Sequence, residues 1–271
     1  MEWLEIFLLG LISGLTEFTP VSSGGHQRLF MHLFGGTQMD PLCRMFLSIG
    51  SLVAVVLACR GSLRRLLAER SIERRGAKFR AYGGRRFDYR IVKSASLPIA
   101  AATATCMLLR LPVGLPFLTV SFILCGIILF VCANIRQGNK DSRKMNKLDS
   151  LFIGLVGCIS AVPGMSLTGL VTSAGIARGA QRQTALNWAL LISMPILLLR
   201  ILTDMLLVIA GGTALNFIGA LCCLGGAVFS YIGGRIAIQL VRFAVNRSGL
   251  SGFAYYLWGV ALLTFILFLI T

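Results

Sequence analysis

The sequence predicts an all-α polytopic membrane protein with six transmembrane helices and two re-entrant helix hairpins arranged as an inverted repeat. The 271 residues are 56% hydrophobic and only 13% charged, whereas soluble domains carry about 25% charge. Most of the charge lies in a few segments between long apolar runs, and two of these runs are broken by similar Pro- and Gly-containing motifs. We therefore expect residues 1–271 to form a single integral membrane domain.

Six unbroken apolar runs are long enough to cross a bilayer, since a spanning helix needs about 20 apolar residues. They lie near 45–59, 91–110, 116–134, 184–207, 213–234 and 251–270. The broken runs cover about 3–34 and 148–178. Irregular backbone at membrane depth is tolerated only where protein or water covers it. Each broken run is therefore predicted to enter the bilayer and return to the same side.

Basic segments between the runs indicate the orientation of the chain, whose net charge is +16. The longest polar segment, 60–93, is expected to be a loop and holds 12 Lys and Arg against 3 acidic residues. Residues 135–147 and the segment after 234 are also basic. The positive-inside rule makes all three cytoplasmic, which puts both termini on the outer face. Topology explains this charge, so we expect the membrane bilayer as partner and no nucleic acid.

The first break carries the densest cluster of polar chemistry. Residues 14–26 read Gly-Leu-Thr-Glu-Phe-Thr-Pro-Val-Ser-Ser-Gly-Gly-His. Glu17 and His26 disfavour hydrocarbon unless they face a partner or a wet cavity, while Pro20 and the glycine pair interrupt a helix. These features favour a functional site. The structural alternatives are a helix contact for Glu17, helix capping by the serines and a hydrogen-bonded structural His26.

The second break, residues 163–169, reads Pro-Gly-Met-Ser-Leu-Thr-Gly. A shift of 143 positions places Gly14 on Gly157, Pro20 on Pro163 and Ser23 on Ser166. The two hairpins start on opposite sides, which is the inverted-repeat design whose broken helices meet near the bilayer midplane and form a binding site.

Phosphate chemistry fits these residue types. Glycine-rich backbone at a helix start favours an anion, a serine with a nearby histidine can form a nucleophile and base, and a carboxylate beside phosphates often holds a divalent cation. Glu17, Ser22 or Ser23, and His26 would then form a phosphoryl-transfer site suited to a lipid phosphate.

Both motifs resemble the signatures of the undecaprenyl-diphosphate phosphatases, the bacitracin-resistance type of membrane lipid phosphatase. The resemblance covers nearly the full length, and segments 179–182 and 193–195 also fall at the expected offsets. It implies hydrolysis of undecaprenyl diphosphate to undecaprenyl phosphate and phosphate at the outer face of the cytoplasmic membrane. It also implies Mg²⁺ or Ca²⁺ as cofactor and a place in recycling the lipid carrier of cell-wall synthesis.

The resemblance also implies roles for individual residues. Ser23 matches the proposed nucleophile, His26 the acid/base and Glu17 a metal ligand. The residues expected to bind the substrate phosphates are Ser22, Gly24, Gly25, Ser166, Thr168, Gly169 and Arg28.

Two departures from the family pattern weaken this assignment. Ser13 stands where the family has a second glutamate, which would share the cation with Glu17. Leu167 stands where the family has an arginine, and a leucine cannot replace a bidentate phosphate clamp. Arg28 and Arg178 are the candidates to replace the missing cation.

Three functions therefore stay open at this point: a lipid-diphosphate phosphatase, a non-catalytic relative that translocates polyprenyl phosphate, and an ion-coupled transporter for another anion. No second carboxylate near Glu17 is apparent for ion coupling. Arg200 and Asp204, spaced i,i+4, are expected to pair with each other within their span. The glycine pairs at 211–212 and 225–226 are expected to allow close helix contacts, either within the chain or in a homodimer.

Overall fold

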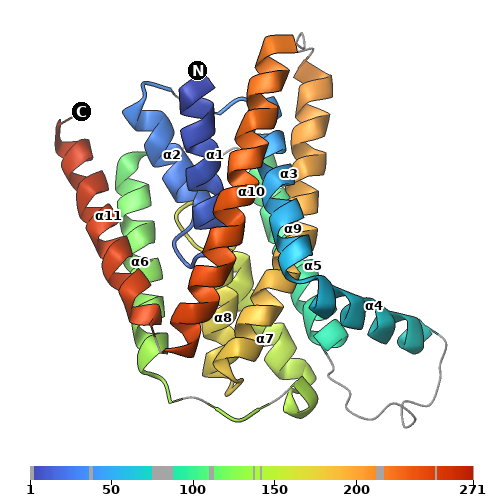
Figure 1. Ribbon diagram of the computed structural model, residues 1–271. Coiled ribbons are helices and arrows are strands. Elements are labelled where there is room, and N and C mark those ends of the chain that lie inside the picture. The colour runs from blue at the N-terminus through green and yellow to red at the C-terminus, as the bar shows by residue number, and fades with distance from the viewer. Residues whose placement is uncertain are drawn as a thin grey trace.

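The computed structural model describes residues 3–36, 39–74, 88–109, 113–136, 138–140, 142–211, 217–247 and 249–270. Within these residues the chain forms a bundle of α-helices with two short 3₁₀ turns, and its only β-type pairing is one isolated bridge between Lys140 and Ala180 (Figure 1). The predicted all-α fold is confirmed.

Six helices of the described chain are long and apolar enough to cross a membrane, as predicted. They are α3 (Pro41–Ala58), α5 (Asp88–Leu109), α6 (Leu115–Asn134), α9 (Arg182–Gly211), α10 (Phe217–Asn246) and α11 (Leu250–Ile270). Their outer surfaces expose many large apolar side chains, such as Val120, Leu206 and Leu269. Such surfaces are expected of helices that face lipid rather than water.

Each broken run folds as two helices separated at the predicted break. The first run gives α1 (Trp3–Phe18) and α2 (Ser23–Leu33), and the second gives α7 (Lys147–Cys158) and α8 (Leu167–Ala177). The packing of the two halves corresponds: α1 packs against α10 as α7 packs against α5, and α3 packs against α10 as α9 packs against α5. An inverted repeat requires this correspondence. The repeat itself, and the re-entrance of the hairpins, stay predictions.

Close contact between α1 and α10 depends on small residues. A Cβ added at Gly14 would lie 2.1 Å from the Ser230 carbonyl oxygen, and one added at Gly10 would lie 2.4 Å from the Gly226 carbonyl oxygen. The backbones can approach this closely only because no side chain intervenes. For Gly226, the close helix contact expected at 225–226 is therefore a contact within the chain.

Two predicted boundaries were wrong. Residues 60–74 of the expected loop form a helix, α4 (Arg60–Arg74), because Leu63 and Leu66 on one face pack against the core; residues 75–87 lie outside the described residues. Helix α10 continues to Asn246 instead of ending near 234. Arg242 is accommodated inside this helix by donating to the Ala58 carbonyl at the end of α3 (3.4 Å).

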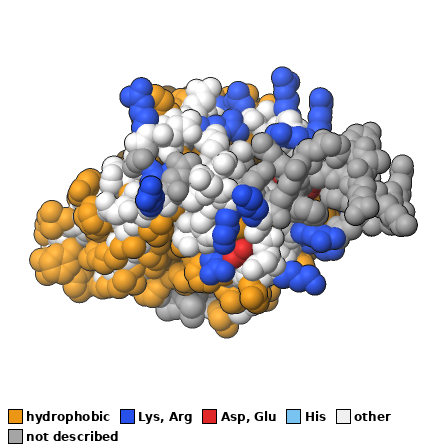
Figure 2. Space-filling model, turned by 90° about the horizontal axis from the view of Figure 1, so that it is seen from below, with side chains coloured by type: hydrophobic (Ala, Val, Ile, Leu, Met, Phe, Trp, Pro, Cys, Tyr) orange, Lys and Arg blue, Asp and Glu red, His pale blue; other side chains and the backbone are white. Residues whose placement is uncertain are grey.

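The two ends of the bundle differ in character. Both chain ends lie at the top of Figure 1, whereas α4 projects from the bottom. Seen from below, many Lys and Arg side chains lie over the middle and right of the molecule, whereas its left part is hydrophobic, as Figure 2 shows. This arrangement agrees with the predicted grouping of the basic segments on the side opposite the termini. Which side is cytoplasmic stays a prediction.

Candidate active site

The two helix breaks meet inside the bundle. At the start of α8, the Ser166 hydroxyl donates to the Thr19 carbonyl (3.3 Å), and the Thr168 hydroxyl donates to the Glu17 carbonyl (3.3 Å). Both side chains are almost fully buried. The structure thus brings the two motifs together, and these two hydroxyls connect the hairpins. Their predicted role in binding phosphate stays a prediction.

The start of α2 has an unusual backbone. Ser22 has φ of 71° and ψ of 100°, a region that costs a non-glycine residue about 1–3 kcal/mol and that clusters at functional sites. Its hydroxyl caps the helix by accepting the Gly25 N–H (3.4 Å). A Cβ at Gly25 would lie 2.6 Å from Phe122, whereas one at Gly24 would meet nothing within 4 Å. The helix start is therefore closed on the Gly25 side and open on the Gly24 side.

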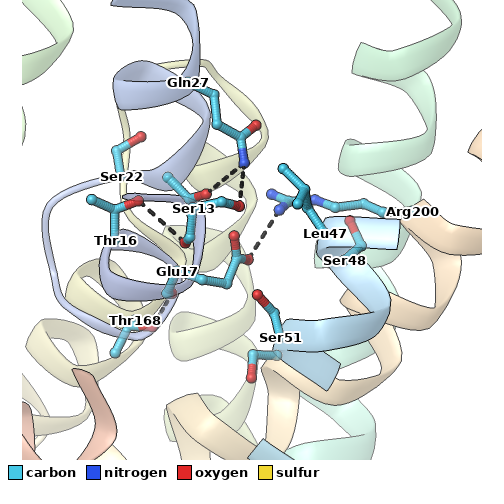
Figure 3. Close-up of polar contacts among 12 residues, drawn as sticks. Ser13, Thr16, Glu17, Ser22, Gln27, Leu47, Ser48, Ser51, Thr168 and Arg200 are labelled. Carbon is cyan, nitrogen blue, oxygen red and sulfur yellow. Dashed lines mark hydrogen bonds and ion pairs between the residues drawn. The ribbon is translucent and has the colours of Figure 1, made fainter. Parts of the chain in front are cut away.

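Ser23 is the first residue of α2, and its hydroxyl is held by a neighbour that sequence reasoning missed. The Gln27 side-chain amide donates to Ser23 Oγ (3.0 Å) and to Ser13 Oγ (2.7 Å) (Figure 3). Gln27 follows Ser23 by four residues, so the i,i+4 spacing in a helix was the signal that could have found it. Ser13, at the position of the missing glutamate, takes part in this contact instead.

His26 is buried between aromatic rings and bonded at both nitrogens. Its Nδ1 lies 2.8 Å from the Ser22 carbonyl oxygen, and its Nε2 lies 2.9 Å from the Tyr256 hydroxyl. A carbonyl only accepts, so Nδ1 carries the proton and Nε2 accepts from Tyr256. The Tyr256 ring is stacked with the imidazole, with 5.6 Å between the two ring centroids. In the described chain no hydrogen bond joins His26 to Ser23. Tyr256 lies 230 positions away, and nothing local in the sequence points to it.

Glu17 forms an ion pair that the sequence did not predict. Arg200 of α9 approaches it with Nη1 3.0 Å from Oε1, and Figure 3 shows the arginine extending toward Glu17 from the opposite side of the site. The predicted pairing of Arg200 with Asp204 is wrong. Asp204 is fully buried and accepts from Arg44 of α3, at 2.8 Å from Nε. Asp204 finds its partner on another helix because α9 packs against α3, which carries Arg44. Arg200 pairs with Glu17 of α1 instead of its i,i+4 neighbour.

The other arginine candidates lie elsewhere. Arg28 is exposed on α2, and Arg178 pairs with Asp149 (2.6 Å). Leu167, in the first turn of α8, packs against the main hydrophobic cluster. Of these side chains, only Arg200 contacts the carboxylate of the first motif.

The donor set does not fit a divalent cation held by the protein. Within the described residues, no three His, Cys, Asp or Glu side chains come together as a potential metal site. Glu17 brings a single carboxylate, already paired with a guanidinium, whereas Mg²⁺ and Ca²⁺ are usually bound by carboxylates together with other oxygen donors. The Mg²⁺ or Ca²⁺ expected from the resemblance gains no support from these contacts.

These features define a class of protein: a polytopic helical membrane protein with two joined helix breaks, the first of which carries a serine, a histidine and a carboxylate paired with an arginine of another helix. The chain belongs to the family described as bacitracin resistance protein BacA, whose model matches residues 6–263. The family resemblance predicted from the two motifs is confirmed.

Curated relatives cover nearly the whole chain. An undecaprenyl-diphosphatase of Carboxydothermus hydrogenoformans is 26% identical over 97% of both chains. Undecaprenyl-diphosphatase 1 of Shouchella clausii is 28% identical, covering 98% of this chain and 96% of its own. An undecaprenyl-diphosphatase of Methanobrevibacter smithii is 27% identical, covering 98% and 97%. The chain is a divergent member of the family at these identities.

Proposed function

We propose that this protein hydrolyses undecaprenyl diphosphate to undecaprenyl phosphate and inorganic phosphate, and so recycles the lipid carrier of cell-wall synthesis. Its family and the names of its relatives support this reaction. The observation that carries the proposal is the joining of the two motifs inside a bundle of apolar helices, where Ser166 and Thr168 bond to the backbone just before the helix that begins at Ser23. A helix start suits the anionic headgroup of a lipid diphosphate, and the partly exposed Arg200 brings a cation to Glu17 of the same motif.

In the proposed reaction, Ser23 Oγ attacks the terminal phosphorus of the substrate. The bond from that phosphorus to the bridging oxygen breaks, undecaprenyl phosphate leaves, and the phosphoryl group stays on Ser23. Water then attacks the phosphoserine, releases phosphate and restores the serine hydroxyl. Gln27 donates to Ser23 Oγ, so this bond leaves the serine proton for a base. His26 Nε2 is the acceptor nitrogen that takes this proton. The Tyr256 hydroxyl orients the imidazole until the substrate binds, and then moves aside.

The placement of the protein is part of the proposal. We place it in the cytoplasmic membrane with the site and both termini on the outer face, because the basic segments lie at the opposite end of the bundle. The homodimer that the sequence left open stays a prediction.

The test is phosphate release from undecaprenyl diphosphate by detergent-purified protein. We expect Ser23→Ala to lower the rate at least ~1,000-fold, because it removes the nucleophile, and His26→Gln to lower it ~100-fold or more, the scale of general acid–base catalysis. Ser94→Ala is the matched control, since Ser94 lies on the exposed surface of α5.

The translocation alternative makes the opposite prediction. A lipid carrier would release no phosphate, and Ser23→Ala would leave lipid movement between the leaflets of a vesicle unchanged. The names of the relatives favour hydrolysis. Absence of release from wild-type protein that still binds the lipid would refute the phosphatase.

A further inference from the structure

Arg200 is the charged group of the site that neither motif contains. It lies within α9, between Pro195 and Asp204, and its partner Glu17 belongs to α1. The Glu17 side chain is 9% exposed and that of Arg200 is 29% exposed. Arg200 is therefore more accessible to a ligand than the carboxylate it pairs with. Figure 3 shows Arg200 reaching Glu17, which lies one helical turn after Ser13 on α1, and Ser13 accepts from the Gln27 amide that also donates to Ser23.

We propose that Arg200 binds the substrate diphosphate in this chain and that its guanidinium takes the place of a divalent cation at Glu17. This inference rests on the proposed function. One Nη atom is engaged with Glu17, whereas a guanidinium has five N–H donors in a planar fork that matches phosphate oxygens. The donors that face away from Glu17 would bind the substrate, while Glu17 holds the fork in place.

Charge at the site supports this assignment. Ser13 and Leu167 are neutral at the positions where the resemblance puts a glutamate and an arginine. Glu17 and Arg200 together are neutral, so the site can receive an anionic headgroup. A divalent cation bound at Glu17 would lie beside the guanidinium, and two like charges this close repel each other. The arrangement therefore favours arginine over metal.

A purely structural reading of the pair is the competing explanation. A buried carboxylate inside a membrane needs a partner, and Arg200 would satisfy that need without touching substrate. This reading predicts damage to folding when Arg200 is changed, but no link between Arg200 and phosphate binding or metal dependence. The experiment must therefore measure these two properties separately from stability.

The experiment compares wild type, Arg200→Gln, Arg200→Lys and Arg44→Gln, each purified in detergent. Arg44→Gln is the matched control, because it also removes an arginine from a buried carboxylate, Asp204. Phosphate release from undecaprenyl diphosphate is measured in EDTA and in Mg²⁺ or Ca²⁺. Binding of inorganic pyrophosphate in EDTA is measured by the rise in melting temperature, which does not depend on catalysis.

We expect wild-type release to be equal in EDTA and in metal. Arg200→Gln should lose about 100-fold in release, the scale for removing one preorganised donor to developing charge, and should lose stabilisation by pyrophosphate. Arg44→Gln should retain both properties. Arg200→Lys keeps the charge beside Glu17 and loses the fork, so it should fold and bind pyrophosphate more weakly than wild type. If Arg200→Gln does not fold, Arg200→Lys is the variant that tests whether Arg200 binds phosphate.

Three outcomes separate the proposals. Release that EDTA abolishes in the wild type overturns the replacement of metal by Arg200. Pyrophosphate binding that survives in both Arg200 variants overturns its role as phosphate ligand. Pyrophosphate binding that depends on Arg200, without hydrolysis of lipid under any condition, supports the ligand role and refutes the phosphatase instead.

Discussion

Tyr256 and His26 show how single residues far apart in sequence complete the site. The phenol donates to His26 Nε2 and its ring covers the imidazole, so α11 fixes the orientation of a histidine on α2. Gln27 fixes Ser23 in a comparable way from the next turn of its own helix. The reactive side chains are thus positioned by groups that need no reactivity of their own.

At this scale we predict that Tyr256→Phe lowers kcat about 10-fold and changes KM less than 2-fold. The ring keeps its stacking, but the hydrogen bond that orients the imidazole is lost, and ~1.4 kcal/mol of barrier corresponds to that factor. The measurement is steady-state phosphate release. Tyr255→Phe is the control, since Tyr255 is exposed and contacts Phe130 and Trp258. Equal losses in both variants would contradict the positioning role.

The sequence indicated the motif residues but not their partners. Glu17, Ser23 and His26 stand out because polar residues in an apolar run require an explanation. Arg200 and Asp204 were wrongly predicted to pair, because i,i+4 spacing produces an ion pair only when no other helix supplies a better partner. Tertiary packing supplied Glu17 and Arg44 instead, and a single sequence does not show which helices will be neighbours.

The crossing of helices α1 and α10 depends on glycines. Their glycines remove side chains from the crossing, so the stability of this contact comes from backbone approach and van der Waals packing, as is common in membranes. The contact also fixes α1, whose Ser13 and Glu17 enter the site from the same helix. The sequence showed that glycines were available for close contact, and the fold shows where they act.

We predict that Gly14→Ala destabilises the protein, because its Cβ would lie 2.1 Å from the Ser230 carbonyl oxygen and the helices must separate. Forced overpacking of this kind costs about 1–3 kcal/mol. Thermal unfolding in detergent measures the effect. Gly259→Ala in α11 is the matched control, because its added Cβ meets nothing within 4 Å. A Gly14→Ala protein as stable as wild type would show that the crossing tolerates separation.

For the whole molecule, the hydropathy and length of the apolar runs were sufficient to predict the six apolar helices. These properties depend on transfer of side chains from water to lipid, which composition largely determines. The helix α4 was missed because its charge concealed the face carrying Leu63 and Leu66. Glu69 of α4 adds a contact with α5 by accepting a hydrogen bond from the Tyr89 N–H at the start of that helix (2.9 Å).

The orientation of the bundle gives a prediction at this scale. We expect a reporter fused at the C-terminus to lie outside the cytoplasmic membrane and one inserted after α4 to lie inside, because basic segments stay cytoplasmic. Protease access to each reporter in intact cells and in opened cells distinguishes the two sides. A cytoplasmic C-terminal reporter would invert the proposed placement of the site.

Detection of a phosphorylated Ser23 would decide whether this serine is the nucleophile. Purified protein is mixed with undecaprenyl diphosphate labelled in its terminal phosphate, quenched in acid within one turnover and digested. We expect label on the peptide that contains Ser23 and none in Ser23→Ala protein, whose phosphate release should be at least ~1,000-fold slower. Turnover without labelled peptide, together with release by Ser23→Ala, would show that water attacks directly and that Ser23 is not the nucleophile.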